Sequence, residues 1–121
     1  MTNTQIVETF VQAWNDMDWD RIADLMTEDV IWHNIPMKKH EGKALVDAAI
    51  RGMGPEGVDW EILSIAENGN KVLTERVDRF DMPGGKKIDL PVMGTFEITD
   101  GKISAWRDYF DLSTFMGQMG R

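Results

Sequence analysis

The sequence predicts an α+β fold in which three N-terminal helices pack on a curved, mainly antiparallel sheet and form a cone with an internal pocket. Helical patterns dominate the first 53 residues, and four strand-like runs separated by turn signals fill residues 58–111. Helices followed by an antiparallel meander are typical of this class. The 121 residues suffice for one domain, so we expect a single domain over 1–121.

Three segments of the first half have a helical pattern. Residues 4–15, with Thr4 as the expected N-cap, place apolar side chains on one face, namely Ile6, Val7, Phe10, Val11 and Trp14. Asp18 is expected to cap a short second helix, and Gly42 precedes a third. These helices can cover one face of a sheet.

Five segments are typical of β-strands. Residues 30–35 are rich in β-formers and end at Pro36, and the later runs cover 58–66, 71–81, 87–99 and 102–111. Residues 68–70, 83–85 and 100–101 are hairpin signals, because Gly, Asn and Asp tolerate the backbone angles of tight turns. The stretch DLSTFMGQMG is expected to form a short closing helix.

Composition narrows the function classes. The net charge of −8 argues against nucleic acid and against anionic membranes as partners, and no apolar run is long enough to cross a bilayer. The absence of Cys excludes disulfides and Cys-based sites. His33 and His40 lack metal-ligand spacing, so we expect no metal. The N-terminus MTNTQIVETF shows no signal peptide, which predicts a cytoplasmic protein.

One strand-like run carries charges on an apolar face. Period-2 alternation puts Arg76 and Asp78 on the same face as Val72 and Phe80. If this face lines the core, the two charges must be paired, because unpaired buried charges are strongly destabilising. The alternative is an ion pair exposed to solvent across neighbouring strands, since most charged residues are exposed.

A second acidic residue lies between aromatic residues. Asp108 shares a strand face with Trp106 and Phe110, and a carboxylate there must be paired or have a raised pKa. Either condition makes Asp108 a candidate general base. Consecutive hairpins bring its strand into one sheet with residues 71–81, so Arg76, Asp78 and Asp108 can converge on the concave side.

Residues 31–36 hold a third candidate element. Trp32 and Asn34 share a strand face, and an Asn amide offers both a donor and an acceptor, which suits holding a water molecule. The alternative for Asn34 is turn chemistry before Pro36.

With these residues the sequence resembles the limonene-1,2-epoxide hydrolase family. The resemblance rests on the segments FVQAW, HNIP, TERVD (74–78), PGGKKIDLPVMGTFEIT and WRDYFDL (106–112), which occur in the same order with similar gaps. It implies the cone-shaped fold shared with nuclear transport factor, ketosteroid isomerase and SnoaL-like polyketide cyclases. It also implies a homodimer, and Leu73 and Val77 on the outer face are candidates for the contact.

The resemblance implies cofactor-independent hydrolysis of a small apolar epoxide to a diol, without a covalent intermediate. Asp108 corresponds to the general base, Asp78 to the general acid, Arg76 to the residue that holds both, and Asn34 to a water-positioning residue. The family usually has Tyr two positions before the Asn, where this chain has Trp32. Because an indole N–H donates but cannot accept, the replacement predicts weaker activity or a different substrate.

Apolar side chains on the same faces predict a tight pocket for a small apolar ligand, although each taken alone is also compatible with plain core. They are Val11, Trp14, Met53, Phe80, Leu90, Val92, Phe110 and Phe115.

Two other functions remain open. One is an isomerase or cyclase of the same fold that uses Asp108 as a base on carbon acids. Tyr109 argues against it, because the only Tyr alternates away from Asp108. The other is a small-molecule-binding protein without chemistry, which Trp32 in place of the Tyr would favour.

Overall fold

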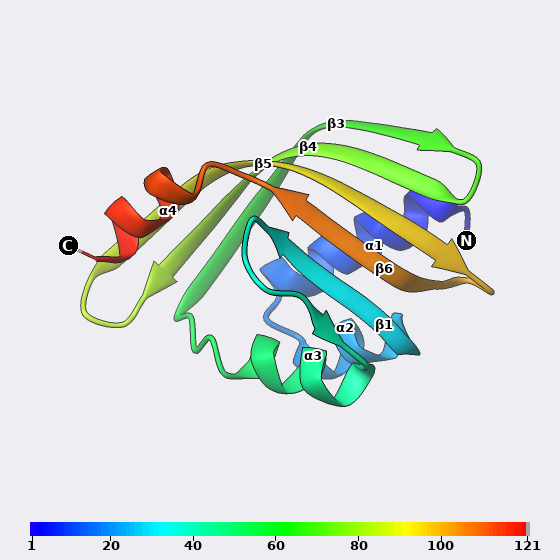
Figure 1. Ribbon diagram of the computed structural model, residues 1–121, viewed down its shortest axis with the longest axis horizontal. Helices are drawn as coiled ribbons and strands as arrows, with labels where there is room; N and C mark the ends of the chain where they lie inside the picture. The colour runs from blue at the N-terminus through cyan, green and yellow to red at the C-terminus, as the bar shows by residue number, and fades with distance from the viewer. Residues whose placement is uncertain (121) are drawn as a thin grey trace.

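The computed structural model describes residues 1–120 and confirms the predicted α+β cone, with helices packed on an open, curved six-stranded sheet (Figure 1). Three helices are N-terminal and one is C-terminal: α1 (Asn3–Asn15), α2 (Trp19–Asp24), α3 (Lys43–Arg51) and α4 (Leu112–Met119). The strands are β1 (Met26–Ile35), β2 (His40–Glu41), β3 (Gly57–Asn68), β4 (Lys71–Met82), β5 (Lys86–Thr99) and β6 (Lys102–Tyr109).

The sheet has the order β2-β1-β6-β5-β4-β3. All neighbouring strands are antiparallel except β1 and β6, which run parallel. The three hairpins β3–β4, β4–β5 and β5–β6 place β4 and β6 on either side of β5, as the turn signals predicted. The parallel pair then brings the N-terminal strand next to β6, so β1, β4 and β6 can supply side chains to one site.

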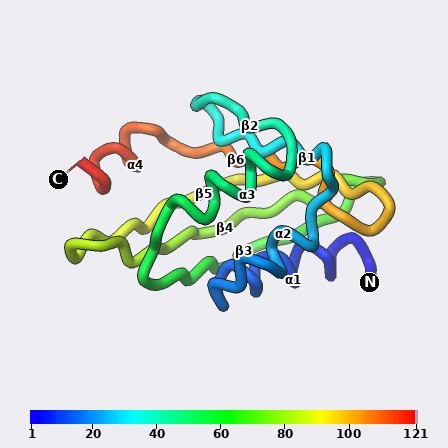
Figure 2. Tube along the Cα trace, turned by 90° about the horizontal axis from the view of Figure 1, so that it is seen from below, coloured from blue at the N-terminus to red at the C-terminus, as the bar shows by residue number. Residues whose placement is uncertain are grey.

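Helices close the inner face of the sheet. Helix α1 contacts β3, β4 and β6, helix α3 contacts β1, and α4 contacts β5. Figure 1 shows α1 running along the sheet, with α4 at the far end of the molecule, and Figure 2 shows α1 beside β3, which it contacts. The closing C-terminal helix is thus confirmed as α4.

The core between α1 and the sheet is aromatic. The Trp106 ring is centred 5.1 Å from Phe10, 5.7 Å from Phe96 and 5.0 Å from Trp32. These side chains are almost fully buried, and large aromatic residues contribute much of the apolar area that a small domain buries. Aromatic side chains therefore pack against one another on the inner face of β1 and β6.

Several element boundaries differ from the prediction. The N-cap of α1 is Thr2, whose hydroxyl accepts a hydrogen bond from the Gln5 backbone N–H, whereas Thr4 donates to Glu67. Strand β1 begins four residues early, because a bulge lets polar residues 27–29 continue the strand without alternating apolar side chains. The two-residue strand β2 was missed, and β6 ends at Tyr109.

Over residues 1–120, none of the helices combines the length and the apolar character that a membrane span requires.

Candidate active site

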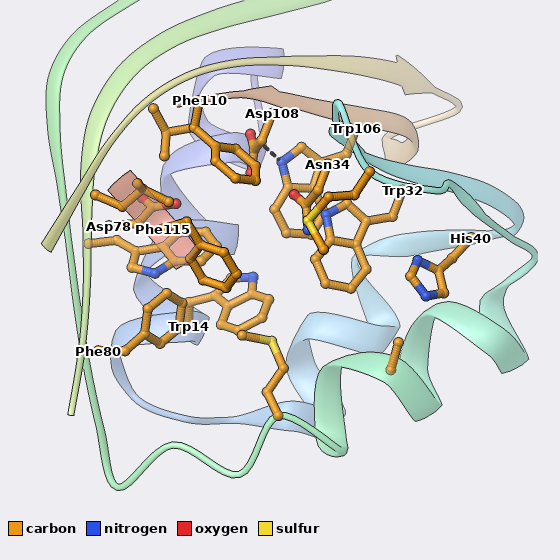
Figure 3. A pocket seen from close by; sticks show the side chains of 16 residues that line it. Trp14, Trp32, Asn34, His40, Asp78, Phe80, Trp106, Asp108, Phe110 and Phe115 are labelled. Carbon is orange, nitrogen blue, oxygen red and sulfur yellow. Dashed lines mark hydrogen bonds between the residues drawn. The ribbon is translucent and has the colours of Figure 1, made fainter. Parts of the chain in front are cut away.

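The candidate site lies on the inner face of the sheet, where β1, β4 and β6 present their polar residues. In the strand register Asn34 is opposite Asp108 across the parallel β1–β6 pair, and Asp78 is opposite Trp60 across β3–β4. Figure 3 shows Asp78, Asp108 and Asn34 around one hollow, with Trp14 and Phe80 on the far side of the view from Asp108. The convergence predicted from strand alternation is confirmed.

Arg76 links the two carboxylates. Its Nε and Nη2 donate to the two oxygens of Asp78 at 3.0 and 2.8 Å, and Nη2 also donates to Oδ2 of Asp108 at 3.0 Å. The Arg76 side chain has no solvent exposure, and each carboxylate side chain is only 6% exposed. The alternative of an exposed ion pair is therefore wrong, and the planar guanidinium fixes both carboxylates.

Two further residues complete the network, and both escaped the sequence prediction as site residues. Thr74 accepts from Nη1 of Arg76 at 3.0 Å and donates to the Gly94 carbonyl. Trp106 Nε1 donates to Oδ1 of Asp108 at 2.9 Å. Each lies two positions before a charged residue on the same strand face, so alternation was the available signal. Each of the three guanidinium nitrogens of Arg76 therefore donates to at least one buried partner.

Burial and the neighbouring charges act differently on the pKa of Arg76 and on that of Asp78. Burial lowers the pKa of Arg76, but the charges of Asp108 and Asp78 raise it by more, so Arg76 stays protonated. Burial, and to a smaller extent the charge of Asp108, raise the pKa of Asp78 to about 6 against the lowering effect of Arg76. Asp78 therefore retains its proton to a higher pH than a solvated Asp does.

Gly94 on β5 makes room for this network. It lies opposite Thr74 on one side and Asp108 on the other. A Cβ at this position would collide with Oδ1 of Asp108 and with Nη1 of Arg76, closer than real Cβ atoms approach any group. No local sequence pattern indicated this role, because the requirement comes from two neighbouring strands.

We expect Gly94→Ala to displace Asp108 or Arg76, lowering the free energy of unfolding by about 1–3 kcal/mol, as overpacking does. Activity should fall along with it. Urea denaturation and the initial rate measure the two effects. Gly117→Ala is the matched control, because a Cβ there meets open space. Equal stability and rate in the two variants would contradict this role.

The carboxylates open onto a cavity of about 300 Å³. Seven of the eight predicted pocket residues line it: Trp14, Met53, Phe80, Leu90, Val92, Phe110 and Phe115. The prediction for Val11 is wrong, because Val11 is buried in the core. It lies three residues before Trp14, about 4.5 Å back along the helix axis, and its side chain packs in the core instead of lining the cavity. Met37, His40, Ala49 and Trp60 also line the cavity and were missed.

Trp32 is part of the cavity wall. Its ring stacks on Trp106 with centroids 5.0 Å apart and on His40 at 5.5 Å. The side chain is almost fully buried, and its indole N–H has no hydrogen-bond partner among the described residues. The position that the family resemblance assigned to a Tyr therefore holds a buried indole N–H without a hydrogen-bond partner.

Comparison with known proteins identifies the family. A model of the limonene-1,2-epoxide hydrolase catalytic domain matches residues 1–121. The chain belongs to this family. Epoxide hydrolase EphG of Mycobacterium tuberculosis is 34% identical over 107 residues, covering 88% of this chain and 71% of EphG.

Solved structures of the family and of related folds agree. One solved structure is of an M. tuberculosis epoxide hydrolase described as similar to limonene-1,2-epoxide hydrolase. It superposes on this chain with a TM-score of 0.87 at 32% identity, covering 98% of this chain and 90% of that one. A protein described as a SnoaL-like polyketide cyclase from Shewanella putrefaciens has a TM-score of 0.84 at 19% identity, covering 99% and 97%. The second likeness shows the cone fold alone. Family membership supports epoxide hydrolysis as the class of reaction.

Proposed function

We propose that this limonene-1,2-epoxide hydrolase family member opens a small, largely apolar epoxide to a vicinal diol in one step and without a cofactor. One observation carries the proposal: a fully buried Arg76 bridges Asp78 and Asp108 at the wall of an apolar cavity. Two carboxylates that share one environment titrate apart, so one supplies a proton while the other accepts one.

We assign the roles from the family resemblance, and the contacts and the raised pKa of Asp78 support them. Asp108, held by Arg76 and Trp106, is the base: it takes a proton from water as the water oxygen bonds to an epoxide carbon. Asp78 is the acid: it gives its proton to the epoxide oxygen as that C–O bond breaks. The products are a diol, a protonated Asp108 and an ionised Asp78. A proton must then return from Asp108 to Asp78 before the next turnover.

Asn34 and Trp32 are proposed to hold the attacking water. The water donates one hydrogen to Asp108 and the other to the Asn34 carbonyl oxygen. The Trp32 N–H is buried without a partner, so a small shift of the ring must expose it before the water oxygen can accept from it. One lone pair remains for attack. An indole needs only to donate in this arrangement, so Trp32 can replace a phenol donor.

We expect Trp32→Phe to lower kcat by roughly 10- to 100-fold, because the variant keeps the aromatic ring and loses a hydrogen bond to the nucleophile worth about 1–3 kcal/mol. Trp32→Tyr restores a donor and should recover much of the rate. Steady-state kinetics on one epoxide check both variants. A Trp32→Phe enzyme with wild-type kcat would remove Trp32 from the mechanism.

The raised pKa of Asp78 predicts the pH dependence. Its acid role requires the protonated carboxyl, and that form is lost as pH rises through about 6. We therefore expect kcat/KM to decline above pH 6, tenfold for each further unit, with the apparent pKa belonging to the Asp78–Asp108 pair. A pH profile of diol formation measures this limb. A rate that rises from pH 6 to 9 would contradict the assignment of Asp78 as acid.

Limonene-1,2-epoxide is a suitable first probe of the proposed function. Purified protein should produce the diol, measured by gas chromatography. The isomerase alternative predicts instead deuterium exchange at the α-carbon of an enolisable ketone in D2O, with no diol from any epoxide. The binding-protein alternative predicts recovery of both compounds unchanged.

We also propose a homodimer formed through the outer face of the sheet. Large apolar side chains are exposed there, at Leu63, Leu73, Met93 and Tyr109. Exposed apolar patches on soluble proteins mark contact surfaces. Light scattering of the wild type and of Met93→Glu checks the proposal: a dimer and a monomer are expected, and a monomeric wild type would contradict it.

A further inference from the structure

Helix α4 covers a stretch of β5 that has no neighbouring strand on one side. Strand β6 pairs with residues 93–99 of β5, while β4 pairs along the opposite edge. Within the part of the chain that the structure describes, residues 86–92 therefore have an open edge on the side of β6. Backbone N–H and C=O groups at such an edge need other partners. Helix α4 makes its main contacts with β5 and supplies them there.

The Gln118 side chain binds both backbone groups of Asp89 on this open edge. Its carbonyl oxygen accepts from the Asp89 N–H at 2.9 Å, and its amide nitrogen donates to the Asp89 carbonyl, also at 2.9 Å. Gln118 thus makes the pair of hydrogen bonds that a residue of a neighbouring antiparallel strand would make. The Lys86 ammonium group adds a hydrogen bond to the Met119 carbonyl at 2.7 Å. These contacts join the C-terminal half of α4 to β5.

The same side of α4 contributes to the cavity wall. Phe115 lies three residues before Gln118 and four before Met119, so the three side chains share one side of the helix. Phe115 lines the cavity together with Leu90 of β5, and Phe115 and Met119 pack against the small apolar cluster to which Leu90 belongs. Figure 3 shows the Phe115 ring at the hollow, with Trp32 across from it. The position of α4 therefore determines where one wall of the cavity stands.

Helix α4 depends on β5 for its position. It has eight residues, none of which is fully buried. An isolated helix of this length is unstable in water, so its tertiary contacts must hold it together. The Asp111 side chain caps its N-terminal end, just after β6, by accepting from the Thr114 N–H. At the other end Gln118 and Lys86 supply the polar contacts, so losing Gln118 should free the C-terminal half of the helix.

We propose that Gln118 is a positioning residue for the substrate cavity: by fixing α4 to the open edge of β5, it keeps Phe115 in the cavity wall. The inference rests on the proposed epoxide hydrolysis and adds a residue that controls substrate binding from outside the cavity. Gln118 neither lines the cavity nor bonds to Asp78 or Asp108. It should therefore affect how tightly an epoxide binds and leave the rate of ring opening unchanged.

A split between KM and kcat tests this role in Gln118→Ala. We expect KM for limonene-1,2-epoxide to rise about three- to tenfold, the effect of one lost hydrogen bond, because Phe115 is no longer held against the substrate. The catalytic carboxylates keep their contacts, so kcat should stay within about twofold.

Gln12→Ala is the matched control, because the Gln12 amide donates only to Asp16 at the end of α1, away from the cavity. It should keep both kinetic constants. A Gln118→Ala enzyme with wild-type KM, or one in which kcat falls and KM does not change, would overturn the proposal.

A double-mutant cycle tests whether Gln118 acts through Phe115. Phe115→Ala should raise KM by itself, because it removes the ring from the cavity wall. Adding Gln118→Ala to this variant should then change KM by less than about twofold, since no ring remains to be positioned. Additive effects of the two substitutions would show that Gln118 acts on the cavity by another route, and would overturn the proposal.

Amide hydrogen exchange tests the attachment of α4 without any epoxide. The N–H groups of Phe115 and Gly120 donate to the carbonyls of Asp111 and Met116, at 3.2 and 2.8 Å, and close the first and last turns of the helix. A helix that has lost its attachment unwinds more often, so both groups should exchange about tenfold faster in Gln118→Ala. This result is expected even if the protein opens no epoxide. Unchanged exchange would show that Gln118 does not fix the helix.

Discussion

Replacing Asp108 by Asn is expected to lower kcat for epoxide opening by roughly a thousandfold, within the range that a general base contributes. The amide has almost the same shape and still accepts a hydrogen bond from Arg76. It cannot take a proton from water, so the nucleophile stays neutral while the ring opens. Diol formation under saturating epoxide measures the effect.

Two comparisons make this result specific. Asp59→Asn changes a carboxylate that is 76% exposed on β3, outside the cavity, and should leave kcat unchanged. Thermal unfolding of Asp108→Asn should remain cooperative, which excludes loss of folded protein as the cause. An Asp108→Asn enzyme that keeps more than a tenth of wild-type kcat would show that another group accepts the proton.

Replacing Arg76 by Met is expected to have the largest effect on stability. Arg76 is fully buried and is the only cation that contacts Asp78 and Asp108 in the described residues. Its loss leaves two buried carboxylates facing one another, and breaking a buried ion pair on one side costs about 3–5 kcal/mol. Urea unfolding should show this loss at pH 8. The loss should shrink at pH 5, because protonation removes the unpaired negative charges.

A compensating variant separates charge from packing. Adding Asp78→Asn and Asp108→Asn to Arg76→Met removes all three charges, so much of the lost stability should return while activity stays absent. Replacing buried ion networks by neutral groups is often close to neutral for stability. An Arg76→Met protein as stable as wild type at pH 8 would contradict the pairing of the three side chains.

Strand alternation predicted the centre of the site because the alternation of side chains can be read from one short segment of the sequence. Arg76 and Asp78 share a face with Val72 and Phe80, and a buried face forces the charges to pair. Hairpin signals then fixed which strands are neighbours, so Asp108 could be brought to the same face without any long-range information. The family resemblance added the roles, and it agrees with the geometry.

Features that depend on two or more distant segments were not predictable. The need for Gly94 arises from Asp108 and Arg76 on the strands either side of it. That the buried indole N–H groups of Trp14 and Trp60 have no hydrogen-bond partner among the described residues becomes visible only in the folded structure. Val11 was misplaced because helical periodicity gives a face but not the depth to which a side chain reaches.

The central claim is that Asp108 activates water for direct attack on the epoxide, and one isotope measurement tests it. The protein, in excess over epoxide, is mixed in H2¹⁸O for a single turnover, and the diol is analysed by mass spectrometry. Direct attack predicts one ¹⁸O atom in the diol from this first turnover. A first-turnover diol without ¹⁸O would mean that a protein carboxylate had attacked the ring and supplied its own oxygen, which would contradict the mechanism.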